Sequence, residues 1–164
     1  MAKQRTFSWE DPSTLWQSVR DLAGLEVLKK VVAGELPPPP MGRLMDIRLV
    51  EVEQGRAVFQ STPSEFHYNP LGTVHGGYAA TLLDSAMGCA VHSTLEAGDT
   101  YTTVEFKINY LRPLSHATGE VRGVGTVINS GRSTALAEGR VEGPDGKLYA
   151  FATCTCLVRR AGDA

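Results

Sequence analysis

One acidic residue stands alone in a long apolar stretch of the sequence. From Gly76 to Leu95, Asp84 is the single residue with a formal charge. The stretch is too long for a strand and is rich in Ala and Leu, which predicts a buried helix. A carboxylate inside such a helix costs several kcal/mol unless it is paired, solvated in a cleft or protonated. Asp84 therefore either meets a hydroxyl or an Arg from another element, or it serves as a base or nucleophile.

The start of the same stretch carries a second group that is suited to catalysis. Gly76 and Gly77 leave the first backbone N–H groups of the expected helix uncovered by side chains. Such N–H groups carry a partial positive charge and suit an oxyanion or a polarised carbonyl oxygen. His75 stands at the helix entrance, where its ring either contacts the carbonyl region or fixes the preceding loop. We favour an orienting role for His75 over acid–base catalysis.

The spacing of these groups predicts an oligomer. Asp84 lies eight residues beyond Gly76, which is roughly 12 Å along an α-helix. A reacting carbonyl carbon needs both groups within roughly 3–4 Å. One helix cannot supply both, but two antiparallel copies across a two-fold axis can. We therefore expect a C2 dimer with two shared active sites, in which Gly76 of one chain meets Asp84 of the other.

The residues around this helix resemble those of a known family. The pattern of Asn69, Gly72, His75-Gly76-Gly77, Ala80, Thr81, Leu82 and Asp84 is similar to that of the hotdog-fold acyl-CoA thioesterases of the phenylacetate-degradation type. The resemblance covers residues 41 to 160 and is specific between 69 and 84. It implies an α+β hotdog fold, in which a strongly curved antiparallel sheet wraps around one long central helix. It also implies hydrolysis of acyl-CoA thioesters.

The resemblance assigns a role to several residues. Asp84 becomes the general base or nucleophile toward the thioester, and the Gly76 N–H polarises the thioester carbonyl. Asn69 matches a position that helps to hold the carbonyl region or the attacking water; alternatively, it forms an Asx turn before Pro70. Thr103, selected over its neighbour Thr102, matches a position that places water near the carboxylate.

Further residues are candidates for contact with the substrate. Aromatic and apolar side chains are expected to line an acyl pocket between the two central helices of the dimer, and they could equally belong to the core. The turn at 131–134 offers free N–H groups, a guanidinium and hydroxyls, which suit the phosphates of CoA. In sequence order these candidates are Phe66, Tyr68, Gly77, Tyr78, Leu82, Arg112, Arg132 and Ser133, with Arg159 and Arg160 as other basic residues.

The period of the apolar residues supports the same fold independently. Alternating segments predict strands at 45–52, 57–62, 100–111, 119–128, 133–142 and 147–159, joined by hairpin signals such as those at 129–131 and 143–146. We expect Val104, Phe106, Ile108 and Tyr110 to share one face of the third strand. Two strands, a long helix and four strands give an α+β layering.

Residues 1–40 read as an appendage to a thioesterase domain at 41–164. An imperfect apolar stripe predicts a helix over residues 12–33, capped by Asp11 and ended by Gly34. Gly24 weakens its middle, so two shorter helices are an alternative. Pro37 to Pro40 predict a stiff extended connector. A DNA-binding helix-turn-helix would need a second, basic helix before the sheet, and the sequence has none.

The composition excludes several classes of protein. A net charge of −2 gives no electrostatic footprint for nucleic acid. The N-terminal residues contain no apolar signal segment, and the 76–95 stretch is a poor membrane span. Three cysteines indicate reduced thiols in a cytoplasmic protein, and Cys154 and Cys156 are expected in the core or at the surface rather than on a metal. No dinucleotide, phosphate-loop or metal-ligand motif is present, so no cofactor is expected.

Three functions remain in competition. The first is hydrolysis of acyl-CoA by a homodimer, or by a tetramer made of two dimers. The second is a hotdog hydratase or dehydratase, which would need a different spacing of His and carboxylate. The third is a non-catalytic acyl-CoA-binding or regulatory module, which has no need for an uncompensated Asp84. The sequence does not determine the acyl group.

Overall fold

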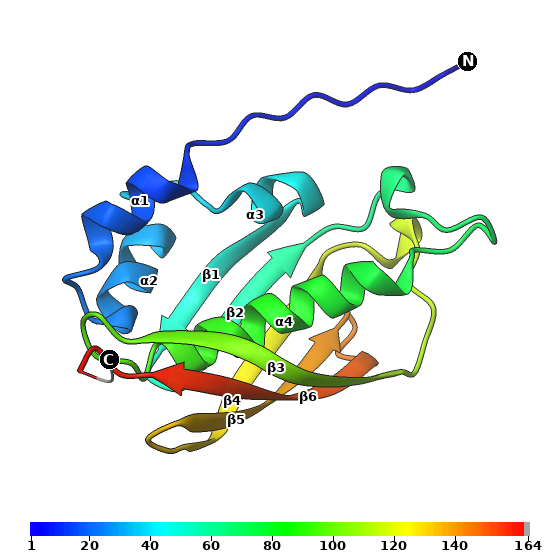
Figure 1. The fold of residues 1–164 in the computed structure, drawn as a ribbon. Coiled ribbons are helices and arrows are strands. Elements are labelled where there is room, and N and C mark those ends of the chain that lie inside the picture. The colour runs from blue at the N-terminus through cyan, green and yellow to red at the C-terminus, as the bar shows by residue number, and fades with distance from the viewer. Residues whose placement is uncertain (163–164) are drawn as a thin grey trace.

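The computed structural model describes residues 1–162, which form one antiparallel sheet curved around a long helix (Figure 1). The helices are α1 (Pro12–Val19), α2 (Gly24–Val32), α3 (Pro40–Met45) and α4 (Gly76–His92), with short 3-10 turns at Glu65–His67 and His116–Thr118. The strands are β1 (Ile47–Glu53), β2 (Arg56–Ser61), β3 (Thr100–Tyr110), β4 (Val121–Ser130), β5 (Thr134–Glu142) and β6 (Leu148–Arg159). Their order in the sheet is β1-β2-β4-β5-β6-β3, with every pairing antiparallel.

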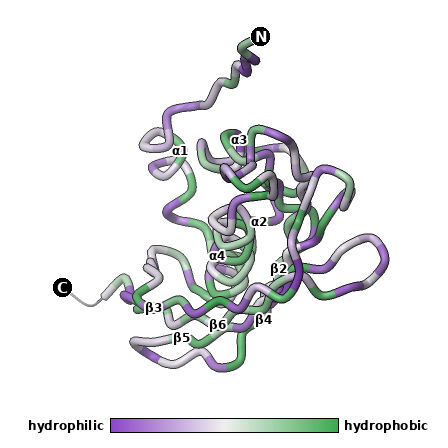
Figure 2. Tube along the Cα trace, turned by 90° about the vertical axis from the view of Figure 1, so that its right-hand side faces the viewer, coloured by the Kyte–Doolittle hydropathy of each residue, from purple (hydrophilic) through white to green (hydrophobic). Residues whose placement is uncertain are grey.

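The core lies between α4 and the concave face of the sheet. Figure 2 shows α4 enclosed between the strands on one side and α2 on the other. Leu82, Leu83 and Met87 of α4 are fully buried. Glycines on the strands allow the close approach, because a Cβ on Gly125 would lie 2.4 Å from the backbone carbonyl of Ala86. Burial of this apolar face, rather than helix propensity, therefore fixes the position of α4.

The two edge strands of the sheet, β1 and β3, both flank α4. A register shift in the pairing of β3 with β6 falls between Thr103 and Glu105. Val104 lies at this bulge and is 58% exposed. The prediction that four apolar residues share one face of β3 is therefore wrong for Val104. The bulge inserts an extra residue and breaks the alternation of side chains. Thr103, which precedes the bulge, is half-buried.

The N-terminal segment forms two helices in place of one, as the alternative prediction held. The Asp11 carboxylate caps α1 by accepting a hydrogen bond of 2.9 Å from the Ser13 N–H. Gly24 begins α2 and packs on the end of α4, since a Cβ there would lie 1.9 Å from the His92 carbonyl oxygen. Gly34 ends the helical region with a φ of +76°. The prediction of an extended connector through Pro40 is wrong at its end, because Pro40 begins α3.

Candidate active site

The Asp84 carboxylate is held by a hydroxyl from the neighbouring edge strand. Thr103 Oγ1 donates a hydrogen bond of 3.0 Å to Asp84 Oδ1. Asp84 is exposed within the single chain, so the expectation of a carboxylate buried in the helix interior is wrong. The reason is the position of α4 at the open side of the curved sheet. One helical face is covered by the strands, and the face that carries Asp84 is not.

A cavity of about 600 Å³ opens beside Asp84. Residues from α4, β1, β2, β3 and the N-terminal segment line it, and most of their side chains are apolar. The lining residues are Leu28, Val31, Pro38, Pro39, Met41, Gly42, Ile47, Leu49, Phe59, Thr81, Asp84, Ser85, Gly88, Cys89, Tyr101, Thr102 and Thr103. Among these, Asp84 is the one residue with a formally charged side chain. This volume is typical of sites for small molecules, which run from about 300 to 1,000 Å³.

Several of these lining residues were missed by sequence reasoning. Thr81 and Gly88 stand three residues before and four residues after Asp84, and this spacing places residues on the same helical face. The periodicity of the helix was therefore the signal that could have found them. Burial and, to a lesser extent, the nearby Asp84 carboxylate together raise the pKa of the Cys89 thiol to about 12, so this thiol stays protonated at neutral pH.

The N-terminus of α4 presents one unpaired backbone donor. His75 caps the helix, since its Nδ1 accepts a hydrogen bond of 2.9 Å from the Gly77 N–H. The expectation that Gly77 also offers a free N–H is therefore wrong. The Gly76 N–H has no hydrogen-bond acceptor within residues 1–162. Because His75 Nδ1 is the acceptor, the neutral ring carries its proton on Nε2, which faces away from the helix cap.

Gly76 is also constrained by a neighbouring aromatic side chain. A Cβ at this position would lie 3.1 Å from the ring of Tyr110, whose hydroxyl donates a hydrogen bond of 3.1 Å to the Gly76 carbonyl. A separate cavity of about 220 Å³ is lined by residues that include His75, Gly76, Tyr110 and Arg112. The two predicted reactive groups, Gly76 and Asp84, thus line different cavities of the same chain, as their separation along the helix requires.

The loop before α4 is organised by Asn69. Its Oδ1 accepts hydrogen bonds from the N–H groups of Leu71, at 2.9 Å, and Thr73, at 3.3 Å. Its Nδ2 donates to Thr73 Oγ1 at 3.0 Å. The Asx turn that the sequence offered as an alternative is therefore present, and these bonds occupy the side chain of Asn69 on the turn itself.

Within one chain, the predicted acyl-pocket residues lie in different surroundings. Tyr78 and Leu82 are 1% and 0% exposed and lie in the core, where burial raises the pKa of Tyr78 to about 12. The helical period accounts for Leu82, which lies about 200° around the helix axis from Asp84. Phe66 is half exposed beneath the Arg5 guanidinium, and the Tyr68 hydroxyl contacts His116 Nδ1 at 2.6 Å.

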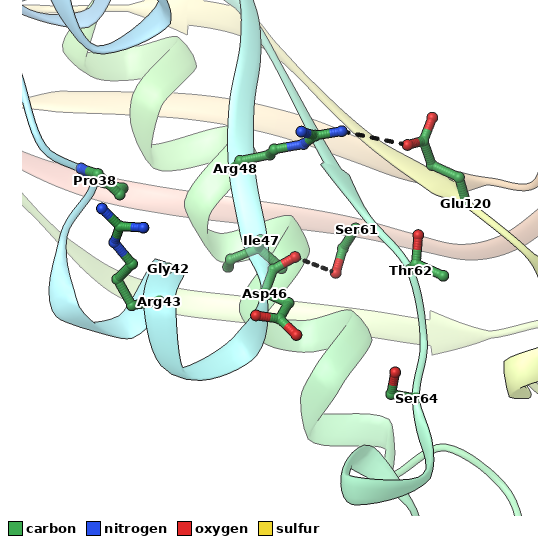
Figure 3. A pocket seen from close by; sticks show the side chains of 10 residues that line it. All are labelled: Pro38, Gly42, Arg43, Asp46, Ile47, Arg48, Ser61, Thr62, Ser64 and Glu120. Atoms are coloured by element: carbon green, nitrogen blue, oxygen red, sulfur yellow. Dashed lines mark hydrogen bonds and ion pairs between the residues drawn. The ribbon is translucent and has the colours of Figure 1, made fainter. Parts of the chain in front are cut away.

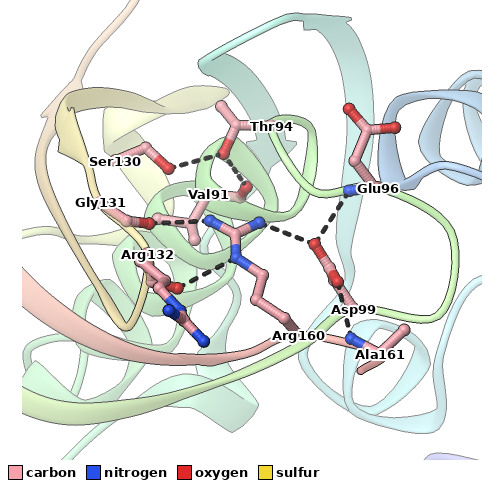
Figure 4. Close-up of polar contacts among 9 residues, drawn as sticks. All are labelled: Val91, Thr94, Glu96, Asp99, Ser130, Gly131, Arg132, Arg160 and Ala161. Carbon is pink, nitrogen blue, oxygen red and sulfur yellow. Dashed lines mark hydrogen bonds and ion pairs between the residues drawn. The ribbon is translucent and has the colours of Figure 1, made fainter. Parts of the chain in front are cut away.

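The residues that were predicted to contact the phosphates of CoA differ in their surroundings. The Arg160 guanidinium pairs with the Asp99 carboxylate at 2.7 Å and donates to the carbonyls of Gly131 and Arg132 (Figure 4). Arg160 therefore ties the chain end to the turn. Arg132 and Ser133 lie exposed at the turn. Arg112, the other candidate, donates to the Leu148 carbonyl.

Residues 1–162 contain neither a metal-binding cluster nor a helix that could cross a membrane. No group of three or more His, Cys, Asp or Glu side chains is arranged to hold a metal ion in this part of the chain. None of the helices there combines the length and the hydropathy that a membrane span requires.

Comparison with known proteins identifies the family. The sequence profile described as "Thioesterase superfamily" matches residues 71–150. A protein of Saccharolobus solfataricus that is named as a candidate esterase is 30% identical over 118 residues, which are 72% of this chain and 82% of the relative. The chain belongs to the thioesterase superfamily.

Other superfamily members agree in sequence and in structure. A 1,4-dihydroxy-2-naphthoyl-CoA hydrolase of Listeria monocytogenes is 29% identical over 114 residues, covering 70% of this chain and 91% of that protein. A solved structure from Ralstonia eutropha, described as a candidate thioesterase related to phenylacetic acid degradation, superimposes with a TM-score of 0.72 at 29% identity. It covers 79% of this chain and 98% of that one. The predicted hotdog fold and the resemblance to phenylacetate-degradation thioesterases are confirmed.

Proposed function

We propose that this thioesterase-superfamily protein hydrolyses acyl-CoA thioesters to a free acid and CoA. One observation carries the proposal: the Asp84 carboxylate, fixed by the Thr103 hydroxyl, lies at the wall of a largely apolar cavity in which no other lining residue carries a formal charge. An apolar cavity suits an acyl group, and a lone carboxylate beside it can deprotonate water or attack the thioester carbon. The CoA hydrolase among the relatives supports CoA as the thiol.

The carbonyl oxygen would be polarised by Gly76 of a second subunit. The Gly76 N–H lies at the start of α4, about two helical turns before Asp84, and has no hydrogen-bond acceptor within residues 1–162. Strand β3 is an edge of the sheet, so its outer backbone groups are open to pairing with a second copy. Antiparallel pairing of two β3 strands across a two-fold axis would set the two α4 helices side by side. This dimer supplies both groups to each site.

The remaining predicted residues have supporting roles in this proposal. Thr103 orients the carboxylate and leaves its second oxygen for water. His75 caps the helix by accepting the hydrogen bond of the Gly77 N–H, which leaves the Gly76 N–H as the donor for the carbonyl. Asn69 holds the loop that leads into α4. Arg132 and Ser133, on the exposed 131–134 turn, are the candidates for the phosphates of CoA.

The test is release of CoA, followed with a thiol reagent over a panel of short, medium, long and aryl acyl-CoAs. Wild-type protein should release CoA, and Asp84→Asn should reduce turnover by about 100-fold or more, because it removes the base but keeps the shape of the side chain. Asp21→Asn, which changes an exposed carboxylate, is the matched control and should keep full activity.

The other outcomes separate the competing functions. Hydration of an enoyl-CoA without CoA release would indicate a hydratase. Tight binding of acyl-CoA with no reaction would indicate a binding or regulatory module. Equal turnover by wild type and Asp84→Asn would remove Asp84 from the mechanism.

A further inference from the structure

One wall of the cavity beside Asp84 is formed by residues that precede the part of the chain matched by the superfamily profile. Residues 24–45, here called the N-terminal strap, comprise α2, the proline connector and α3. The strap precedes the residues 71–150 that match the superfamily profile. Six of the cavity-lining residues belong to the strap: Leu28, Val31, Pro38, Pro39, Met41 and Gly42.

The strap is fixed to the domain at both ends. At its start the Gly24 N–H donates a hydrogen bond of 3.0 Å to the Leu95 carbonyl, and Gly24 packs directly against His92. At its end, Ser61 Oγ of β2 donates a hydrogen bond of 2.8 Å to the Asp46 carbonyl just beyond α3 (Figure 3). Gly42 contributes to this end as well, because a Cβ there would lie 3.0 Å from the Ile47 carbonyl oxygen.

The segment between these anchors is conformationally restricted. Four consecutive prolines, Pro37 to Pro40, each have a fixed φ, so the connector resists bending. Leu28 of α2 is 6% exposed, which shows that the helix packs firmly on the domain. The strap is therefore a rigid wall of the cavity, and its dimensions are set by side chains such as Val31 and Met41.

We propose that the acyl group of the thioester lies in this cavity beneath the strap, and that Val31 limits the size of the acyl group that is accepted. The inference rests on the proposed function. The six strap residues bear no formal charge, and Asp84 lines the same cavity, so an apolar group that is bound here can bring its carbonyl end to the carboxylate. A volume of about 600 Å³ suits an uncharged medium-length or aryl acyl group better than an acetyl group.

The chain offers a matched pair of positions for the test. Val31 lines the cavity, whereas its neighbour Val32 does not and is 39% exposed. Val31→Phe should lower the ratio of kcat/KM for the longest efficiently used acyl-CoA to that for butyryl-CoA by about tenfold or more. Val32→Phe should leave that ratio unchanged. Val31→Ala should shift the preference toward longer chains, which provides a reading in the opposite direction if the Phe variant does not fold.

Two results would overturn the inference: Val31→Phe changes kcat/KM equally for all chain lengths, or it changes kcat/KM for none of them. Either result counts only if the circular dichroism spectrum of Val31→Phe matches that of Val32→Phe, which shows that both variants are folded. If wild type releases CoA and Val31→Phe gives one of these results, the inference about Val31 fails and the proposed function stands. If wild type releases no CoA, the proposed function fails, and binding of S-alkyl-CoA thioethers by calorimetry decides the inference.

In the calorimetric experiment, affinity should rise by about fourfold for each added methylene until the cavity is filled. Val31→Phe should shorten the chain at which this rise stops, and Val32→Phe should not. Affinity that is independent of alkyl length, or a rise that Val31→Phe leaves unchanged, would place the acyl group elsewhere.

Discussion

The hydroxyl of Thr103 lies 3.0 Å from the carboxylate of Asp84, and this hydrogen bond joins the edge strand β3 to the central helix α4. Thr103 immediately precedes the register shift of β3. The bulge therefore helps to determine which strand side chain faces the helix. Bulges commonly change the direction of a side chain next to a functional site.

Removal of this hydroxyl should reduce turnover while preserving the fold. Thr103→Val keeps the shape of the side chain, and a hydrogen bond to a charged group contributes about 1.5–3 kcal/mol, so kcat should fall by roughly 10- to 100-fold. Thr103→Ser retains the hydroxyl and should recover most of the activity. Steady-state kinetics of the two variants provide the measurement, and equal activities would show that the hydroxyl is dispensable.

The role of the Gly76 N–H can be separated from the effect of an added side chain by comparing two variants. Gly76→Pro removes the N–H, and loss of one oxyanion donor typically lowers kcat by about 10²- to 10³-fold. Both Gly76→Pro and Gly76→Ala place an atom against the Tyr110 ring, but Gly76→Ala keeps the N–H. The ratio of kcat between the Ala and Pro variants therefore isolates the donor. A ratio near one would refute the carbonyl-polarising role.

A site shared between subunits predicts complementation. Asp84→Asn and Gly76→Pro chains should each be inactive alone. After mixing in equal amounts with subunit exchange, a mixed dimer has one site with both intact groups, so activity should recover to about a quarter of that of wild type. The measurement is CoA release before and after exchange. If activity does not recover although mass spectrometry detects mixed dimers, the two groups act within one chain.

The Asp99–Arg160 pair should make stability depend on pH. Burial alone raises the pKa of Asp99, but hydrogen bonds from Arg160 and from the N–H groups of Ala161 and Glu96 outweigh it and hold the pKa below 3.8. A lowered carboxyl pKa stabilises the fold above the unfolded-state value, and this contribution is lost as the pH falls through the lower, folded-state pKa. Asp99 has a side chain only 5% exposed, so the pair is shielded from solvent.

Asp99→Asn should therefore cost about 1.5–3 kcal/mol of unfolding free energy near neutral pH. The difference from wild type should shrink as the pH falls through the lowered folded-state pKa, where the wild-type carboxylate also becomes protonated. Urea unfolding at several pH values measures both quantities. Asp145→Asn, which changes an exposed carboxylate, serves as the control and should leave stability nearly unchanged. A difference that persists unchanged at acid pH would contradict the electrostatic explanation.

The sequence by itself determined the order of the strands along the chain, the long central helix, the family and Asp84 as the candidate reactive group. These are local properties. The alternation in the strands β3 to β6 and the long, largely apolar run from Gly76 are encoded in short windows, and so are the turn residues that separate the strands. A lone charge in such a run is visible without any knowledge of its neighbours.

Only the tertiary structure decided which surfaces these elements present to one another. The curved sheet covers the face of α4 that bears Leu82 and leaves the face that bears Asp84 open. A bulge in β3 sets Thr103 against the carboxylate, and α2 returns from the N-terminus to build the wall of the cavity with Val31. These contacts join residues that are distant in sequence, so they follow from sheet curvature and side-chain packing rather than from any local pattern.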